Sequence, residues 1–567
     1  MKIICLVKQV PAIGAIEFDE ETKTLKREGV PLELNVFDRY AVRHAAALGD
    51  EVIAMTMGPP QAEEALRECM ALGADRAIHL SDRAFAVADT LGTSRTLALA
   101  IRKEGADIVI CGRKSLDSET WQVTPETAAF LGWPHVTNVV SIAPGLQVTR
   151  ETDDGEEVYE VEPPVVLSVA APPDYEPQPK DGPIEVWTAS DLVDDVRPND
   201  KRFGQTGSPT RVLAVRDATP ERKRVRAQSV DEAAQLVAEL LAERAPEQPP
   251  WEKPGHVAEE PGAFYDCWSV VDFAGDRPRR VSLELLARGR ELAGKLGGKN
   301  VALLIGHGLE DAVSVVTRYG AEVVYVADDP GLAEYQPELW ASVVQDVLTE
   351  LRPHVLLIPA TARGRDFGPR AAGELELGMT GDCVGVDIVK AGRLLQQKPA
   401  YGGNIVSVIM ASTTPQLATV RPRMYEPLDP RDDAEAEVRK LPPMKLPEPR
   451  LRLVERRESS TGALLDEADV VVAGGSTAEL AALEEIAAPK GAAVGPSSDI
   501  GLLGRAVAPL LYVAIGVDDE PEHWAGSVKA RVIVSIGASS PESADVCLID
   551  DWQDALPRLL DVVPRTR

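Results

Sequence analysis

Residues 105–132 read GADIVICGRKSLDSETWQVTPETAAFLG, and residues 350–378 read ELRPHVLLIPATARGRDFGPRAAGELELG. Each stretch runs from a short apolar strand through a polar turn into a helical pattern that ends at glycine. A second pair, ALGADRAIHL (71–80) and RYGAEVVYVA (318–327), places Gly-Ala-acid between a helix end and a strand. Matching positions stand 246 or 247 residues apart: Gly73 and Gly320, Asp107 and His354, Gly132 and Gly378. Chance similarity would let this distance drift, so the sequence predicts two copies of one α/β domain.

Short β-branched runs alternate with helical patterns throughout the first copy, at residues 3–7, 51–55, 77–80 and 107–111. This alternation is typical of a parallel sheet covered by helices. The same rhythm returns near the end of the chain, in VVVA (470–473), AAVG (492–495), LYVAIG (511–516) and RVIVSIG (531–537). We therefore expect an α/β protein with two homologous doubly wound parallel-sheet domains and a third α/β domain.

Two proline-rich acidic stretches divide the chain, at residues 246–262 and 426–450. Repeated proline interrupts both helices and sheet ladders, so both stretches are predicted to be linkers. The expected domains are therefore 1–245, 263–425 and 451–567.

A helical arm is expected at the end of the first domain. A capping box from Ser229 to Glu232 opens it. Its apolar residues fall on one face, namely Ala233, Leu236, Val237, Leu240 and Leu241. The pattern is compatible with packing on the second copy or on its own domain.

Composition excludes several classes of partner. The 567 residues carry a formal net charge of −30, which repels nucleic acid and anionic membranes. No segment reaches the roughly 18 apolar residues of a membrane-spanning helix, so no membrane insertion is expected. The six cysteines form no CxxC and have no histidine at ligand spacing, so we expect buried free thiols, no metal site and a reducing, cytoplasmic location.

Paired glycines mark a possible phosphate site in the third domain. Gly474 and Gly475 follow a buried strand and precede a helix. Backbone N–H groups at such a helix start attract phosphate, although many α/β turns use paired glycines only for tight geometry.

Longer strings resemble the electron transfer flavoprotein family. LVKQVPA (6–12), LNVFDRYAVRHAAAL (34–48) and residues 112–139 are similar to its beta subunit. VSLELLARGRELAGKLGG (281–298), PATARGRDFGPRAA (359–372) and residues 397–424 are similar to its alpha subunit. The resemblance implies beta–alpha pairing within one chain. It also implies two adenine nucleotide alpha hydrolase-like domains that form a platform for a third, FAD-type domain.

The resemblance places a nucleotide in the first domain: AMP, or a second FAD in electron-bifurcating members. The implied contacts are Val7, Lys8, Asn35, Met57, Gly58, Asp117, Thr120, Gln122, Val123 and Thr124. The loop from Asp117 to Thr124 suits this role because it is rich in polar side chains and precedes a helix start. A polar connection with helix caps only is the alternative. Trp121 and Thr124 stand where the family usually has glycine.

The resemblance places FAD in the third domain, with contacts at Gly474, Gly475, Ser497, Ser498, Glu522, His523 and Asp550. Three departures from the family pattern occur there. Ser498 replaces an arginine, a QVGQTG loop is deleted after Ile500, and acids precede His523 at 518–520. Carboxylates close to a pyrophosphate or a reduced flavin are repulsive. His523 has a second interpretation, as a residue that caps or packs beside Trp524.

The resemblance implies an electron carrier rather than a catalyst with its own substrate. Electrons would come from a flavin dehydrogenase and pass to a redox protein or quinone reductase, with the third domain swivelling on the 426–450 linker. The stretch 170–187 is short and acidic, so docking to acyl-CoA dehydrogenases through it is not expected. The alternative is a flavin-free, AMP-binding scaffold or regulatory module. A bifurcating carrier is disfavoured because neither site keeps its full glycine pattern.

Overall fold

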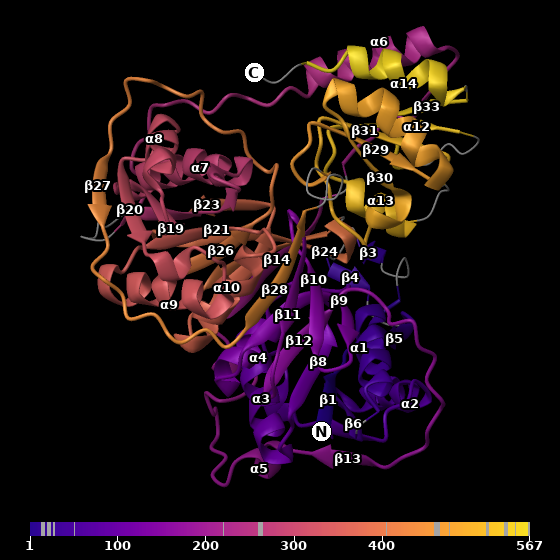
Figure 1. Ribbon diagram of the computed structural model, residues 1–567, viewed down its shortest axis with the longest axis vertical. Helices are drawn as coiled ribbons and strands as arrows, with labels where there is room; N and C mark the ends of the chain where they lie inside the picture. Colours follow the sequence, from indigo (N-terminus) through magenta and orange to yellow (C-terminus); the bar gives the residue numbers. More distant parts are fainter. Residues whose placement is uncertain are drawn as a thin grey trace.

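The computed structural model describes residues 1–567 except 13–16, 20–23, 27–28, 50, 219, 259–264, 404, 459–464, 476, 518–520, 538–541, 550 and 565–567. The side chains of 17–19, 24–26 and 477–478 are not described either. Three α/β domains are visible in Figure 1. The prediction of an α/β protein with parallel sheets is confirmed.

The N-terminal domain is built on a ten-stranded sheet of order β13-β7-β6-β1-β8-β12-β9-β10-β11-β28. Its parallel core is formed by β1 (Lys2–Leu6), β6 (Glu51–Met57), β7 (Arg76–Leu80), β8 (Ile108–Gly112) and β12 (Val165–Val169). Covering helices are α1 (Val36–Ala47), α2 (Glu63–Ala71), α3 (Thr90–Glu104) and α4 (Val123–Leu131). The antiparallel extension consists of β9 (His135–Ala143), β10 (Gln147–Glu151) and β11 (Gly155–Glu160), while β13 (Ile184–Trp187) lies at the opposite edge.

The second domain repeats this topology. Its sheet has the order β22-β26-β21-β16-β19-β20-β27, so β20-β19-β16-β21-β26 corresponds to β7-β6-β1-β8-β12. These strands are β16 (Cys267–Val271), β19 (Asn300–Gly306), β20 (Val323–Asp328), β21 (Val355–Pro359), β22 (Met379–Cys383) and β26 (Gln416–Val420). The helices are α7 (Arg280–Leu296), α8 (Glu310–Arg318), α9 (Pro337–Asp346) and α10 (Gly364–Glu374).

The two copies meet through equivalent helices. Helix α4 packs against α10, which stands at the matching place in the repeat. Their approach is close: a Cβ on Gly373 would lie 3.0 Å from the Cβ of Ala129 and 3.2 Å from the Cα of Glu126. A side chain at residue 373 would hold the helices apart, so this glycine permits their contact.

Residues 210–243, at the end of the range predicted for the first domain, extend to both other domains. Strand β14 (Thr210–Asp217) pairs with β25 (Ile405–Ala411) in an antiparallel sheet with β24 (Leu394–Ala400) and β23 (Gly385–Ile388). Strand β15 (Val225–Ala227) then becomes the edge of the third domain's sheet.

That third sheet has the order β15-β33-β32-β31-β29-β30. Its strands are β29 (Val470–Gly474), β30 (Ala493–Pro496), β31 (Leu511–Ile515), β32 (Val532–Ile536) and β33 (Val546–Leu548), and its helices α12 (Thr477–Ala487), α13 (Pro521–Ser527) and α14 (Trp552–Asp561).

Helix α6 (Val230–Glu243) belongs to this third domain as well. Ser229 caps it as predicted, accepting from the backbone N–H of Glu232. However, the prediction that it packs on the second copy or on its own domain was wrong. Its apolar stripe shares a core with α12, α14 and the strands β31 to β33, so the three helices cover one face of that sheet together.

The predicted linker 426–450 is not a free tether. Strand β27 (Glu437–Lys440), which lies within it, pairs in parallel with β20. Strand β28 (Arg452–Glu458) follows directly and pairs with β11 of the N-terminal domain. The prolines flank these strands instead of interrupting them, so strand pairing is possible.

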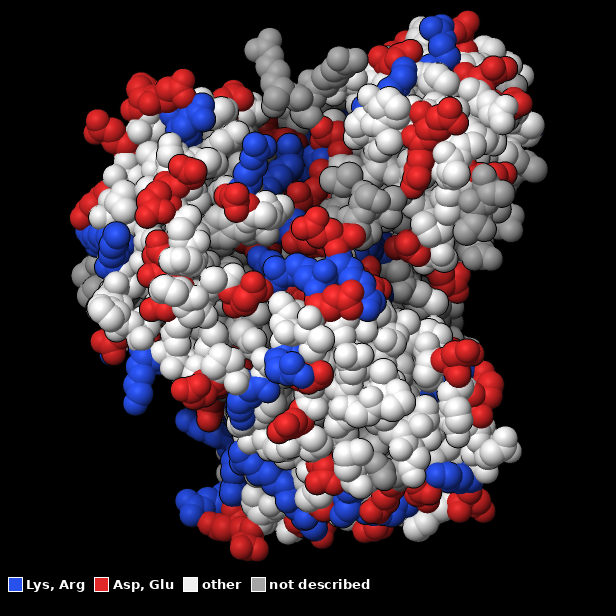
Figure 2. All heavy atoms as spheres, viewed as in Figure 1, with Lys and Arg blue, Asp and Glu red and all other residues white. Residues whose placement is uncertain are grey.

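Arginine pairs join the second domain and the segment after it to the third domain. Arg423 lies 2.6 Å from Asp469, Arg279 lies 3.2 Å from Glu467, and Arg531 lies 2.6 Å from Glu426. Figure 2 shows a band of basic side chains bordered by acidic ones at the level where the domains meet. The third domain is therefore held on the platform by charge as well as by strand pairing.

A buried ionic cluster lies between the two copies. Asp366 on α10 accepts from Arg150 at 2.7 Å and from Tyr335 at 3.1 Å, and the Nε2 atom of His135 lies 2.8 Å away. Burial alone would raise the pKa of Asp366, but the charge of Arg150 holds it well below its usual range. The pair is ionised and shielded from water.

Replacing Asp366 by asparagine should destabilise the paired copies by up to about 3–5 kcal/mol, because the buried Arg150 would lose its closer counterion and keep only Glu157, at 3.6 Å. Chemical denaturation followed by circular dichroism measures this. As a control, Asp432→Asn removes an exposed partner of Arg318 and should cost less than about 1 kcal/mol. Equal effects of the two variants would contradict the role given to Asp366.

Candidate functional site

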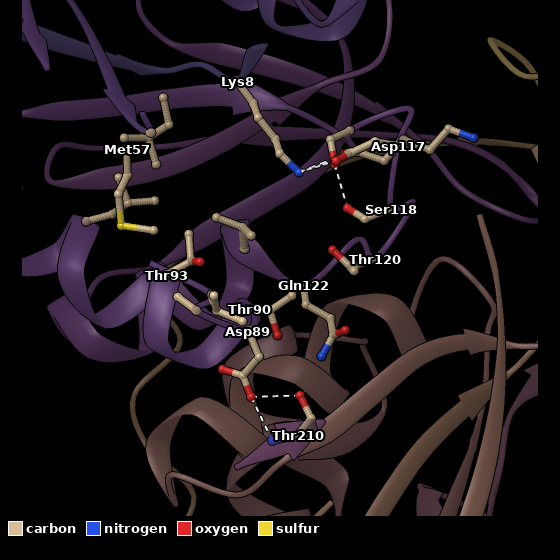
Figure 3. A pocket seen from close by; sticks show the side chains of 18 of the residues that line it. Lys8, Met57, Asp89, Thr90, Thr93, Asp117, Ser118, Thr120, Gln122 and Thr210 are labelled. Carbon is tan, nitrogen blue, oxygen red and sulfur yellow. Dashed lines mark hydrogen bonds and ion pairs between the residues drawn. The ribbon is translucent and has the colours of Figure 1, made fainter. Parts of the chain in front are cut away.

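A cavity of about 1360 Å³ opens at the carboxyl ends of β1, β6 and β8 in the N-terminal domain. The sheet order reverses between β1 and β8, and ligands of open α/β sheets bind outside such a reversal. Strands β14, β24 and β25 contribute to its far side, so both copies line it. Figure 3 shows polar side chains facing this space from opposite walls.

One wall carries a lysine and a carboxylate. Lys8 follows β1, and its ammonium lies 2.7 Å from Asp117 in the loop after β8. Burial alone would raise the pKa of Asp117, but Lys8 and hydrogen bonds from Ser115 and Ser118 lower it overall. Figure 3 shows this pair beside Thr120, facing the cavity.

The opposite wall begins at helix α3. Asp89 caps this helix by accepting from the N–H of Gly92 at 2.9 Å. Its other oxygen accepts from the N–H and hydroxyl of Thr210 on β14, at 2.9 and 2.7 Å. Thr90 and Thr93 on the first turns of α3 line the same wall. Sequence reasoning missed these residues, although hydroxyls three apart at a capped helix start are a usable signal.

Nine of the ten residues predicted to contact a nucleotide line this cavity: Val7, Lys8, Met57, Gly58, Asp117, Thr120, Gln122, Val123 and Thr124. The tenth, Asn35, is buried behind the wall. Its side chain donates to the carbonyl of Lys114 and accepts from the N–H of Leu116, at 3.0 and 3.2 Å. Asn35 therefore shapes the loop instead of facing a ligand.

The side chain of Gln122 is hydrogen-bonded to the second copy. Its amide donates to the carbonyl of Met379 and accepts from the N–H of Gly381, both at 3.1 Å. It also donates to Glu126 at 3.1 Å. The side-chain amide thus links α4 to strand β22 and fixes the start of α4.

The backbone conformation at Trp121 explains why glycine suits this position. Its φ is 61°, in the left-handed region that favours glycine. The cost is offset by cation–π contacts, since the guanidinium groups of Arg113 and Arg365 lie 5.3 and 4.8 Å from its ring centroid. The second departure, Thr124, is buried, and its hydroxyl lies 2.9 Å from the sulfur of Cys111.

The described residues of this cavity fit a phosphorylated nucleotide. Gln122 occupies the N-cap of α4, but its side chain accepts no hydrogen bond from the first N–H groups of the helix, so these stay available for an anion. Hydroxyls and Lys8 supply further donors. Drug-sized ligands occupy about 300–1000 Å³. The larger volume here admits a dinucleotide.

The predicted FAD residues of the third domain lie apart from this cavity, and none of those described lines it. Gly474 is buried at the end of β29, whereas Gly475 is exposed. Ser497 and Ser498 lie in a short 3₁₀ turn after β30, and Glu522 and His523 lie in α13. Asp550 and the acids at 518–520 lie outside the described residues.

His523 is a packed histidine. Its Nδ1 lies 3.0 Å from the carbonyl of Ser497, which can only accept, so this nitrogen carries the proton. Its Nε2 then accepts from the hydroxyl of Tyr512 at 2.8 Å. The ring also meets Trp524 edge to face, with centroids 5.1 Å apart. Of the two interpretations of His523, the packing one agrees with the structure.

Other site classes find no support in the part of the chain that the structure describes. There, no three of its histidine, cysteine, aspartate and glutamate side chains gather as a metal site requires. Within the same residues, no helix is long and apolar enough to cross a membrane. All six cysteines are buried, and none of them is in a disulfide.

Comparison with known proteins agrees with the repeat. The model of the electron transfer flavoprotein domain matches residues 22–192 and again 267–446. The chain belongs to the electron transfer flavoprotein family. The two matched segments coincide with the two copies.

Relatives of both subunit types match almost in full. The electron transfer flavoprotein subunit alpha of Thermoanaerobacterium thermosaccharolyticum is 32% identical, over 54% of this chain and 99% of that protein. The subunit beta of the same organism is 38% identical, over 43% of this chain and 99% of that protein. A subunit of the caffeyl-CoA reductase–Etf complex of Acetobacterium woodii, CarD, is 40% identical over 38% of this chain and 86% of that protein. The chain is a fused beta-type and alpha-type electron transfer flavoprotein.

Glu126, below the cavity, should make stability depend on pH. It accepts from Thr90 and Ser94 at 3.0 Å, and burial, with Asp89 nearby, raises its pKa to about 8. The unfolded chain releases this proton at a lower pH, so stability should fall between roughly pH 4.5 and 8, by on the order of 4 kcal/mol.

Unfolding midpoints measured from pH 5 to 9 test this expectation. Glu126→Gln keeps the site neutral and should make the decline shallower, while the part due to buried Asp38 and Glu284, whose pKa values burial raises to about 7, should remain. Glu64→Gln, on the exposed face of α2, should follow the wild type. An unchanged decline in Glu126→Gln would rule out Glu126 as its source.

Proposed function

We propose that this chain is a single-chain electron carrier whose redox cofactor is FAD, held in the N-terminal cavity. It would accept electrons from a flavin dehydrogenase and pass them to a redox protein or quinone reductase. The observation that carries the proposal is the cavity itself, which combines dinucleotide size, an uncapped helix start and lining from both copies.

Each wall has a distinct task in this proposal. The N-terminus of α4 and Lys8 would hold the phosphates, because both offer positive potential at the carboxyl edge of the sheet. Thr90, Thr93 and Thr210 would hydrogen-bond the ribityl or ribose hydroxyls. The apolar lining, including Leu6, Met55, Leu97 and Ile409, would exclude water from an aromatic ring.

A flavin bound there would supply one- or two-electron transfer. The protein's contribution would be orientation and electrostatics. Lys398, from β24, is buried in the wall and donates to the carbonyls of Glu119 and Gly381 at 3.1 and 2.9 Å. It places positive charge at the end of the cavity that both copies share, which would favour a reduced, anionic cofactor.

A second candidate function is a flavin-free, AMP-binding regulatory module. It is favoured by the packed state of His523, which leaves the third domain without the histidine that a flavin contact would use. In that case AMP would bind at α4 and Lys8 and leave the remaining cavity empty.

Identification of the nucleotide separates the two functions. The purified chain is heat-denatured, and the released nucleotide is quantified by chromatography, before and after incubation with FAD. Our proposal requires FAD, with an absorbance spectrum that bleaches on anaerobic dithionite titration. AMP alone, with no flavin retained after incubation, would establish the second function instead.

Filling the cavity should remove the cofactor without unfolding the protein. Thr93→Arg would project a bulky cation between the walls, and we expect at least about a tenfold loss of FAD affinity. Thr349→Arg, on an exposed helix of the second domain, is the matched control and should retain full occupancy. Flavin fluorescence quenching on titration gives both affinities. Equal affinities would show that the cofactor binds elsewhere.

A further inference from the structure

The segment Gly501–Arg505, here called the docking segment, joins the third domain to the N-terminal domain. It follows Ile500, where the family's QVGQTG loop is missing from this sequence. Leu502 is only 5% exposed and shares a small apolar cluster with Phe37 and Leu116 of the N-terminal domain. In Figure 1 the third domain faces the N-terminal domain on the side of α1 and α13.

Polar contacts hold the docking segment on both sides. The guanidinium of Arg113 donates to the carbonyls of Leu503 and Gly504, the latter at 3.1 Å. Arg505 reaches in two directions, to Asp466 at 2.7 Å and to Glu151 on β10. Hydrogen bonds and ion pairs with charged groups of both domains therefore hold this short segment in place.

Between the docking segment and α13 the described residues leave no gap. The N–H of Leu502 donates to the carbonyl of Glu522 at 2.7 Å. A Cβ on Gly526 would lie 2.3 Å from the nitrogen of Gly501, and one on Gly501 would lie 2.7 Å from the oxygen of Glu522. An aromatic ring system has no room there, so this side of Glu522 and His523 is closed to a flavin.

The docking segment also contacts the loop that lines the N-terminal cavity. Leu116 and Arg113 both belong to the loop between β8 and α4. Arg113 lies 4.7 Å from the ring centroid of Phe37 and 5.3 Å from that of Trp121, which lines the cavity. Through these two residues, the position of the third domain determines the position of the cavity loop.

We propose that the third domain binds no flavin and instead acts as a brace, with Leu502 as the residue that positions the nucleotide-binding loop 113–124. The expected effect on nucleotide affinity rests on the proposed function. The contact of the third domain with the loop does not depend on it. A chain of this kind holds one nucleotide cofactor, and losing the Leu502 contact loosens its binding site.

Leu502→Asp in the full-length chain tests the brace, because a carboxylate cannot remain in the cluster with Phe37 and Leu116. Hydrogen–deuterium exchange should speed up in residues 113–124, and FAD affinity should fall about tenfold. The neighbouring Leu503→Asp is the matched control, since that side chain is already 37% exposed and should change neither quantity. Retained protection of residues 511–515 shows that the third domain is still folded.

Flavin stoichiometry provides the second readout. Saturation of the wild type with FAD should give one equivalent per chain, and Thr93→Arg should lose it. Two equivalents, or one equivalent that survives Thr93→Arg, would overturn the brace. Unchanged exchange in residues 113–124 of Leu502→Asp would overturn it as well. Hydrogen–deuterium exchange can be measured without a cofactor. If no flavin binds at all, the proposed function fails, but the exchange result still tests the brace.

Discussion

The buried carboxylate of Asp366 is the constraint on which the paired architecture depends. It lies on the second copy, yet its strongest partner, Arg150, lies on the first. Separating the copies would break this pair, leaving Arg150 with Glu157 alone and Asp366 without its arginine, so the pair exists only in the joined arrangement. The packing of α4 against α10 follows, and with it the start of α4 and the loop before it. The cavity is thus a property of the pair of domains.

This dependence gives the N-terminal cavity a composite wall. Asp89 is held by β14, β14 is held by β25, and Gln122 is held by β22. The affinity for a nucleotide that contacts α3 and α4 would therefore depend on the second copy, although the nucleotide would touch little of it. The third domain adds a further layer, since Arg113 and Leu116 of the cavity loop contact the docking segment. Fusion of the subunits keeps these layers at a fixed stoichiometry.

The repeated domains and one wall of the cavity could be predicted from the sequence, because strand–turn–helix units carry local signals. Lys8, Gly58 and the loop from Asp117 to Thr124 follow strands whose carboxyl ends meet in any doubly wound sheet. Long-range pairing leaves no such signal. The position of α6 depends on which domain's core accepts its apolar stripe, and β27 (EVRK) is mostly charged. Nothing local in Leu502 reveals that it reaches Phe37, because this contact depends on how whole domains dock.

The path of residues 210–243 has a consequence for synthesis on the ribosome. Arg222 and Asp545 pair at 3.0 Å although they are 323 residues apart in the chain. At typical elongation rates of roughly 5–20 residues per second, the early partner waits on the order of tens of seconds for the late one. During that interval β15 and the apolar stripe of α6 are without their sheet. This nascent segment therefore keeps an apolar surface exposed until residues 470–560, on which it packs, have been translated.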